Sequence, residues 1–233
     1  SGRKWYEENS VLLKSVSDKN RKMVRDIQFD YYEGLFEVWR KDAKFVLNKL
    51  ELFSEENDFF SNRLDLDKIG MLGWSFGGAL SIQMTYDDPR VSAAVFHDGQ
   101  LLGDVYKYGT KSPVMLMHGK MRHEKIEGSS LPYMLEQWKE KDDQFSNKTD
   151  SPWYELDIKG PASTHQHFSD NVLFDRKYDI KKSHRTHEII IDYTLRFFDR
   201  YLKNESNNFH NVKGEDNDEF HFRSFNNGSL KND

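Results

Sequence analysis

The pentapeptide GWSFG at residues 73–77 is the feature that most restricts what this chain can fold into. In a G-x-S-x-G motif the serine lies on a sharp turn between a strand and a helix, and small neighbours leave room for that turn. The apolar run 69–72 precedes the motif, and 79–86 has a helical pattern that ends before Pro89. The sequence therefore predicts a strand, a tight turn and a helix. Three glycines are expected to supply the room: Gly73, Gly77 and Gly78.

Further strands and helices alternate along the chain. Residues 91–96 and 113–117 are apolar runs that end in Asp-Gly and His-Gly, which is typical of buried parallel strands. A helix is predicted over 131–141, a fourth strand over 153–158, and a closing helix carries an apolar stripe through Phe197. This order predicts an α/β architecture, with a mostly parallel sheet covered by helices.

A long helix precedes the motif, because its apolar residues recur at three- and four-residue steps on one face. They are Val24, Ile27, Tyr31, Leu35, Val38, Trp39, Val46, Leu47 and Leu50. At the other end, residues 204–233 are rich in Asn, Asp, Lys and Gly, and their apolar residues follow neither the helical nor the strand period. We therefore expect one compact domain over 1–203, followed by an extended polar tail over 204–233.

Composition excludes several kinds of site and partner. The net charge of -5 is small, and acidic and basic residues are mixed along the chain, so a nucleic-acid partner is not expected. Zero cysteines exclude disulfides and thiolate nucleophiles, and leave the redox compartment open. No apolar run is long enough to span a bilayer, and residues 1–9 lack a signal-peptide pattern, so any export signal is expected upstream of this chain.

Ser75 is the candidate nucleophile, and a serine hydroxyl needs a base that accepts its proton. Among nine histidines, His165 is the best candidate, because it lies in the loop after the last predicted strand. His167 is the rival. The H-x-H spacing of this pair has no convincing third metal ligand, so neither a metal nor another cofactor is expected.

Four other histidines are not expected to take part in catalysis. His97 and His118 end predicted strands, where histidines are usually packed or hydrogen-bonded. His184 and His187 precede the closing helix and are expected to be solvated near its start.

The acid that orients the base has two candidates. Asp98 follows the strand after the motif, so its carboxylate is expected at the same sheet edge as Ser75. Glu124 follows the next strand, but its neighbours Arg122, His123 and Lys125 are typical of a solvated loop. Asp98 is favoured because a solvated glutamate orients an imidazole poorly. The backbone N–H of Phe76 is the expected oxyanion donor.

Three stretches resemble the platelet-activating factor acetylhydrolases, including bacterial relatives and streptococcal secreted esterases. The first runs from RKDAKFVLN at 40–48 through LDLDKIG at 64–70 into WSFGG at 74–78. The second is FHDG at 96–99, with Gly103 and Asp104 shortly after it. The third is HQHFSD at 165–170. On these motifs the resemblance implies Ser75, Asp98 and His165 as the catalytic residues.

The same resemblance implies hydrolysis of a short or oxidised acyl ester at the sn-2 position of a phospholipid, without calcium or a cofactor, in a secreted protein. Two residues depart from that family's pattern. Trp74 stands where the motif usually has His, and its side chain is expected to point away from the reaction. Gln100 stands where the mammalian enzymes have Trp.

The beginning of the chain also departs from that family's pattern, because the family's fold normally has several strands before the long helix. A loop after one of those strands supplies the second oxyanion N–H. We therefore expect this chain to be the C-terminal portion of the domain, held against an N-terminal fragment of the same protein, with the strand before Ser75 otherwise left as a sheet edge.

Two alternatives to the phospholipid substrate remain open at this point. One is a broad carboxylesterase or polyester hydrolase, and the other is a binding protein that keeps the hydrolase fold as a scaffold. Apolar residues after Asp98 are expected either to pack beneath a loop or to form a lip for transient contact with a lipid surface. They are Leu101, Leu102, Tyr106 and Tyr108.

Overall fold

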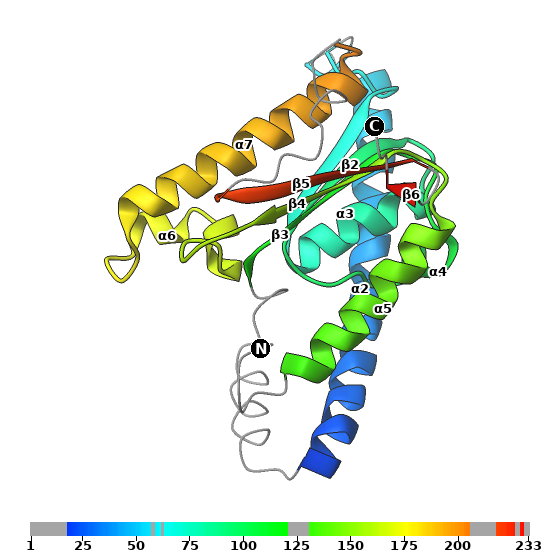
Figure 1. Cartoon of the computed structure of the whole chain (residues 1–233). Coiled ribbons are helices and arrows are strands. Elements are labelled where there is room, and N and C mark those ends of the chain that lie inside the picture. The colour runs from blue at the N-terminus through cyan, green and yellow to red at the C-terminus, as the bar shows by residue number, and fades with distance from the viewer. Residues whose placement is uncertain are drawn as a thin grey trace.

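A computed structural model describes residues 18–56, 59–61, 63–120, 131–205, 218–226 and 229–230 (Figure 1). Its elements follow one another in this order: α2 Asp18–Glu56, β1 Ile69–Trp74, α3 Phe76–Asp87, β2 Val91–His97, α4 Val105–Tyr108, β3 Val114–His118, α5 Leu131–Lys148, β4 Trp153–Ile158, a 3₁₀ helix His165–Phe168, α6 Asn171–Phe174, α7 Ile180–Leu202, β5 Phe220–Asn226 and β6 Ser229–Leu230.

These strands form one mostly parallel sheet. In the part of the chain that the structure describes, six strands lie in the order β1-β2-β3-β4-β5-β6. The first four are parallel to one another, while β5 is antiparallel to β4 and β6 is antiparallel to β5. The α/β architecture predicted from the sequence is confirmed, and the four parallel strands all end at one edge of the sheet.

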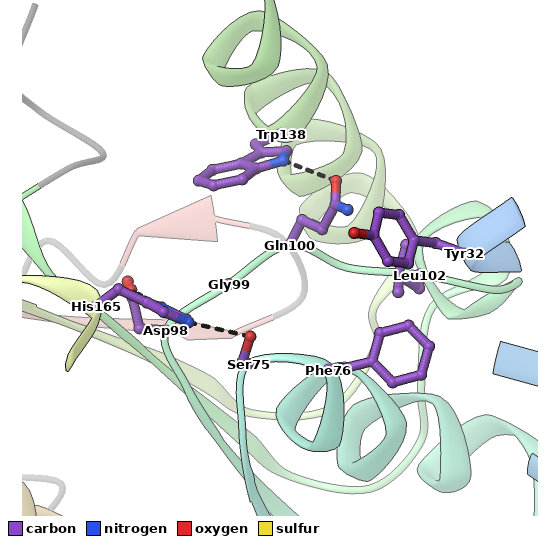
Figure 2. Close-up of a pocket in the computed structure, with 9 residues that line it drawn as sticks. All are labelled: Tyr32, Ser75, Phe76, Asp98, Gly99, Gln100, Leu102, Trp138 and His165. Atoms are coloured by element: carbon purple, nitrogen blue, oxygen red, sulfur yellow. Dashed lines mark hydrogen bonds and ion pairs between the residues drawn. The ribbon is translucent and has the colours of Figure 1, made fainter. Parts of the chain in front are cut away.

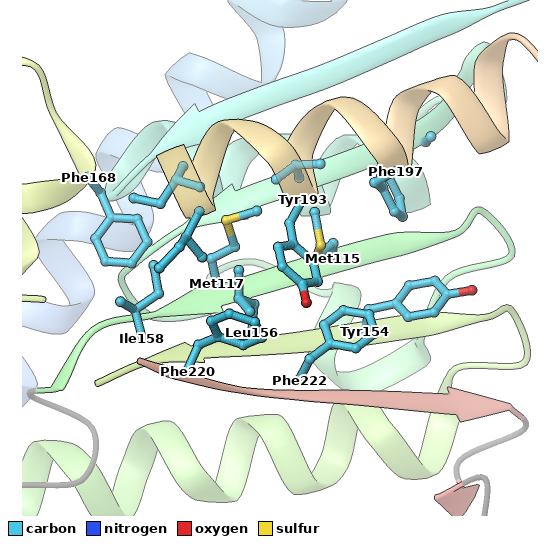
Figure 3. Close-up of a cluster of buried hydrophobic side chains, with 14 residues drawn as sticks. Met115, Met117, Tyr154, Leu156, Ile158, Phe168, Tyr193, Phe197, Phe220 and Phe222 are labelled. Carbon is cyan, nitrogen blue, oxygen red and sulfur yellow. The ribbon is translucent and has the colours of Figure 1, made fainter. Parts of the chain in front are cut away.

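Helices cover both faces of the sheet, and side chains of β2 alternate between them. Ala93 and Val95 face the cluster beneath α7, while Ala94 and Phe96 face the cluster beneath α3. Figure 3 shows the α7 side, where Tyr193 and Phe197 of the helix lie over methionines of β3. Strands with apolar residues on both faces are therefore buried, as parallel strands require.

The opposite face is covered by α2, α3 and α5 (Figure 1). Phe36, Ile82 and Phe145, one from each of these helices, are all fully buried there. Along the same helix α2, Val38 and Val46 remain 52% and 53% exposed, so its apolar residues are not confined to the buried face. None of the helices within the described ranges is long and apolar enough to cross a membrane.

The C-terminal residues correct one expectation from the sequence. Residues 220–226 are not an extended tail: they pair antiparallel with β4 over its whole length, from Phe220 opposite Ile158 to Phe225 opposite Trp153. Phe220 and Phe222 are buried in the cluster beneath α7. The sequence FHFRSFN does alternate with period two, but its polar surroundings concealed this strand signal.

The start of the closing helix is a second correction. Helix α7 begins at Ile180, where the Asp179 side chain accepts hydrogen bonds from the Lys181 and Lys182 N–H groups. His184 and His187 therefore lie inside the helix rather than before it. His184 is exposed as expected, but His187 is only 9% exposed, because it faces the sheet.

Candidate active site

Ser75 occupies a strained turn between β1 and α3. Its φ of 57° and ψ of -121° lie in a region that residues with side chains rarely adopt. The Ser75 N–H donates to the carbonyl oxygens of His97 at 2.8 Å and Asp98 at 3.1 Å. The end of β2 therefore holds this turn in place, and the strain is typical of a residue positioned for function.

Close backbone contacts explain two of the three glycines around this turn. A Cβ on Gly73 would lie 2.2 Å from the Gly77 carbonyl oxygen, and one on Gly78 would lie 2.7 Å from the Gly73 carbonyl oxygen. A Cβ on Gly77 would meet nothing within 4 Å. Gly73 and Gly78 supply the room that the turn needs, and the expectation was wrong for Gly77.

Three residues from distant parts of the chain meet at the carboxyl edge of the sheet. The His165 Nε2 lies 3.1 Å from the Ser75 Oγ, and its Nδ1 lies 2.6 Å from the Asp98 Oδ2. Figure 2 shows the imidazole between the other two side chains. The structure thus brings together the three residues that the sequence singled out, in the arrangement of a nucleophile, a base and an acid.

Asp98 has a separate partner for each carboxylate oxygen. Its Oδ1 accepts a hydrogen bond from the Gly119 N–H at 2.9 Å, so its Oδ2 is left for the imidazole. The residue is 5% exposed and follows β2 directly, with a φ of 43°. Two fixed hydrogen bonds and burial make Asp98 a rigid orienting group for His165.

Trp74 contacts both the backbone and the ring of His165. Its indole Nε1–H donates to the His165 carbonyl oxygen at 3.0 Å, and the two rings lie 4.9 Å apart with a 32° angle between their planes. The expectation that Trp74 points away from the reaction was therefore wrong. The side chain before the serine packs directly against the base.

The rival base is held away from Ser75. The His167 ring is 3% exposed, its Nδ1 lies 2.8 Å from the Thr164 Oγ1, and its ring packs against Tyr178. Burial, together with His187 and Lys120, lowers the pKa of His167 below its usual range. His167 is therefore a buried structural residue of the 3₁₀ helix, and it is not the base for Ser75. The rival acid Glu124 lies outside the described residues.

The other histidines at strand ends are packed, as expected. His97 Nε2 lies 3.2 Å from the Thr194 Oγ1 of α7, and burial lowers the pKa of His97 to about 4. His118 is 1% exposed and lies against the Phe96 ring. Within the described ranges, no group of three or more acidic or histidine side chains is arranged to hold a metal ion.

A pocket of about 430 Å³ opens beside the Ser75 hydroxyl. Its lining contains the three residues of the hydrogen-bonded chain and a largely apolar wall. Tyr32 of α2 and Trp138 of α5 belong to this wall, and sequence reasoning did not select either one. No motif marks them, because helices distant in the chain bring them here only after folding.

The loop after Asp98 is held in place by two buried leucines and by hydrogen bonds to two charged side chains. Leu101 and Leu102 are at most 1% exposed, so they pack beneath the loop rather than forming a lip for lipid contact. The Lys141 Nζ donates to the Leu101 carbonyl oxygen at 2.9 Å, and Glu33 accepts from the Gly103 N–H at 3.2 Å. Burial lowers the pKa of Lys141 to about 8.

Helix α3 begins at Phe76, immediately after the serine. The first N–H groups of a helix have no partner within the helix, and the positive end of the helix dipole adds to their attraction for negative charge. The Phe76 N–H has this position next to Ser75. It is suited to stabilise an oxyanion that forms when the serine attacks a carbonyl group.

The parallel sheet, the strained serine turn and the position of the histidine after β4 define a domain of the α/β-hydrolase class. Residues 48–173 match the family described as "BAAT / Acyl-CoA thioester hydrolase C terminal". This range covers more than half of the 233 residues, so the chain belongs to that family. Membership supports an esterase or thioester hydrolase in general and does not single out the platelet-activating factor acetylhydrolases.

A solved structure supports the same fold. The chain is similar to the ferulic acid esterase from Streptomyces cinnamoneus, with a TM-score of 0.57 and 23% sequence identity. The alignment covers 76% of this chain and 51% of the esterase, so this chain spans about half the length of that protein. A comparison with curated proteins found no match.

Proposed function

We propose that this protein is a serine hydrolase that cleaves carboxylic acyl esters through an acyl-serine intermediate. The observation that carries the proposal is the continuous hydrogen-bonded chain from Ser75 through His165 to Asp98, at 3.1 Å and 2.6 Å. A buried carboxylate, an imidazole and a strained serine next to a pocket are the groups that acyl transfer requires.

In the proposed mechanism, His165 Nε2 takes the proton as the Ser75 Oγ attacks the ester carbonyl carbon. Asp98 keeps the imidazole in the required tautomer and stabilises the imidazolium. The Phe76 N–H stabilises the oxyanion. The tetrahedral intermediate then collapses to an acyl-serine as the bond to the alcohol oxygen breaks, and this oxygen takes the proton from His165 so that the neutral alcohol leaves. His165 then activates water for attack on the acyl-serine, which releases the acid and restores the Ser75 hydroxyl.

The substrate is proposed at two levels. A short acyl ester is the broader one, and the sn-2 acetyl ester of a platelet-activating factor-like phospholipid is the narrower one, supported by the three sequence stretches named above. Family membership adds acyl thioesters as candidates. Initial rates on an acetyl phospholipid, an acetyl thioester and simple esters of rising chain length separate these substrates from a broad carboxylesterase or polyester hydrolase.

The decisive test uses Ser75→Ala. We expect this variant to lose turnover of p-nitrophenyl acetate and labelling by a fluorophosphonate probe, while its circular dichroism spectrum stays unchanged. Ser81→Ala is a matched control, because Ser81 lies in α3 and its hydroxyl bonds to the Gly77 carbonyl oxygen. An unlabelled wild-type Ser75 would favour the alternative of a hydrolase-fold binding protein.

A partner is also proposed. Strand β1 lies at the end of the described sheet, and its Leu72 is 51% exposed. We propose that an N-terminal segment of the same protein pairs with β1 and supplies the second oxyanion N–H. Losing one such donor costs roughly 10²- to 10³-fold in rate.

Hydrogen exchange tests this partner. The β1 amides are expected to exchange slowly in a longer protein that carries the proposed N-terminal segment and faster in the 233-residue chain. Equal exchange at β1 in the two proteins would contradict the proposed pairing. The internal strand β2 is the control, since its two neighbours are present in both.

A further inference from the structure

Gln100 is a polar side chain in the wall of a pocket that is otherwise lined mainly by apolar and aromatic groups. It lies two residues after Asp98, on the loop that leaves β2 (Figure 2). Ser75, His165 and Asp98 make no hydrogen bond to the Gln100 side chain, and the proposed acyl transfer does not use it. Its amide is therefore available for another purpose.

Trp138 fixes which way this amide points. The Trp138 indole Nε1 lies 2.7 Å from the Gln100 Oε1. An indole N–H is only a donor, so the atom that faces it must be the amide oxygen, and the amide nitrogen must occupy the other branch. Figure 2 shows that nitrogen on the side of the Tyr32 ring. Among the described residues it has no hydrogen-bond partner.

A directed NH₂ group has a defined preference. It donates hydrogen bonds and accepts none, so it suits a neutral or anionic oxygen and gives no favourable contact to a cationic group. A substrate without an acceptor at this point leaves the amide unsatisfied once the pocket is filled, which weakens its binding.

The aromatic walls restrict the shape of the group that carries this oxygen. The Phe76 ring is held edge-on by Phe36 at 5.2 Å and by Trp39 at 4.8 Å between ring centroids. Tyr32 and Trp138 complete a wall of rings around a volume of about 430 Å³. This volume is in the range of pockets that enclose whole small ligands, well beyond what an acetyl group needs, and flat rings pack well against such walls.

We propose that Gln100 is a specificity-determining residue, which donates a hydrogen bond to an oxygen substituent on an aromatic acyl group. The substrate class is then esters of aryl or arylalkenoic acids whose ring carries a hydroxyl or ether oxygen. This inference rests on the proposed function of the same site. The ether or phosphate oxygen of a phospholipid has the same acceptor chemistry and is the competing source.

The test compares two esters that differ by one oxygen, methyl cinnamate and methyl 4-hydroxycinnamate. The wild type is expected to prefer the hydroxylated ester in kcat/KM, and Gln100→Leu is expected to reduce that preference roughly 5- to 10-fold, the effect of one neutral hydrogen bond. Trp138→Phe keeps a ring but removes the N–H that orients the amide. It is expected to reduce the preference by a smaller factor.

Controls separate this effect from general damage. Gln144→Leu removes the same amide from an exposed position of α5 outside the pocket, and the preference is expected to stay at the wild-type value. Fluorophosphonate labelling of Ser75 is measured in each variant, because it reports an assembled nucleophile independently of the substrate. A preference unchanged in a labelled Gln100→Leu variant would overturn the inference.

Two further outcomes are distinguishable. If Gln100→Leu alters only the hydrolysis of a 1-alkyl-2-acetyl phospholipid, the aromatic class is wrong and a lipid oxygen is the group that Gln100 binds. If the wild type hydrolyses no ester and Ser75 is not labelled, the proposed function itself fails. A wild type that hydrolyses both cinnamates at equal rates contradicts only the role of Gln100.

Discussion

Trp74 shows how much one side chain next to the nucleophile contributes to the arrangement of the base. It contacts His165 in two ways, through a hydrogen bond to the backbone and through ring packing at 4.9 Å. An aromatic face beside an imidazole also attracts the ring when it becomes positively charged. His165 becomes an imidazolium when it takes a proton from Ser75 or from the hydrolytic water, so this contact is strongest during the reaction.

Trp74 substitutions are therefore expected to lower kcat rather than raise KM. Trp74→Leu loses both the ring face and the N–H, and we expect kcat on p-nitrophenyl acetate to fall about 10-fold. Trp74→Phe keeps a ring, so about a 3-fold decrease is expected. Steady-state kinetics with thermal melts as the folding control check this. A rise in KM at constant kcat would assign Trp74 to substrate binding instead.

His97 makes stability depend on pH. Burial, opposed in part by Asp98 and reinforced by His187, lowers its pKa from 6.5 to about 4. Between these values the unfolded state binds more protons than the folded state, so the stabilising effect is complete above pH 6.5 and is lost as pH falls toward 4. The loss amounts to at most about 3 kcal/mol in the free energy of unfolding.

Urea unfolding at several pH values between 4 and 7 measures this dependence. The free energy of unfolding of the wild type is expected to fall as the pH is lowered, and His97→Asn is expected to show a smaller fall. Wild-type and variant curves that run parallel over this range would show that another group causes the acid sensitivity.

At the scale of elements, the turn between β1 and α3 depends on how closely two backbone segments approach. A Cβ on Gly73 would overlap the Gly77 carbonyl group at 2.2 Å, and neither backbone segment has a flexible end that can move away. At Gly77 the same addition meets no atom within 4 Å. The two glycines of one motif are therefore under different constraints.

Gly73→Ala and Gly77→Ala form a matched pair that tests this difference. Gly73→Ala is expected to destabilise the fold by about 1–3 kcal/mol or more and to abolish esterase activity, because the serine turn must open. Gly77→Ala is expected to keep the melting temperature of the wild type within a few degrees. Equal losses in both variants would mean that the motif is limited by something other than this backbone contact.

At the scale of the whole molecule, the C-terminal strand completes a core that begins far away in the chain. Phe222 of β5 stacks on Tyr154 of β4 and lies beside Tyr193 of α7. On the other face of the same strand, Phe225 stacks on Trp153 at 3.8 Å. Both faces of β4 therefore rely on β5, although the 3₁₀ helix, α6 and α7 lie between the two strands in sequence.

A chain that ends at residue 217 is thus expected to lose its fixed tertiary structure. The removal exposes the apolar side chains of β4 and leaves that strand as an edge, which favours aggregation. Near-UV circular dichroism and the soluble yield measure the effect. A polar tail without a structural role would instead leave both unchanged, and Phe222→Ala, at a cost of about 3–5 kcal/mol, isolates the contribution of one ring.

Much of the architecture could be predicted from local pattern alone. The strands at 69–74 and 91–97 are continuous apolar runs, and the helix at 180–202 carries an apolar stripe, so each of these signals lies within one short segment of the chain. Strand β5 has a weaker pattern in polar surroundings, and its burial depends on β4 and α7. The pocket residues Tyr32, Gln100 and Trp138 carry no local signal, since each comes from a different element.

The sequence by itself determined the candidate nucleophile, base and acid, because each follows a strand or turn whose local pattern requires it. Parallel strands deliver such residues to one sheet edge whatever the details of packing. Only the tertiary structure decided that Trp74 packs on His165, that Gly77 is unconstrained and that Trp138 orients Gln100. These contacts depend on distances between segments far apart in the chain, which no sequence period records.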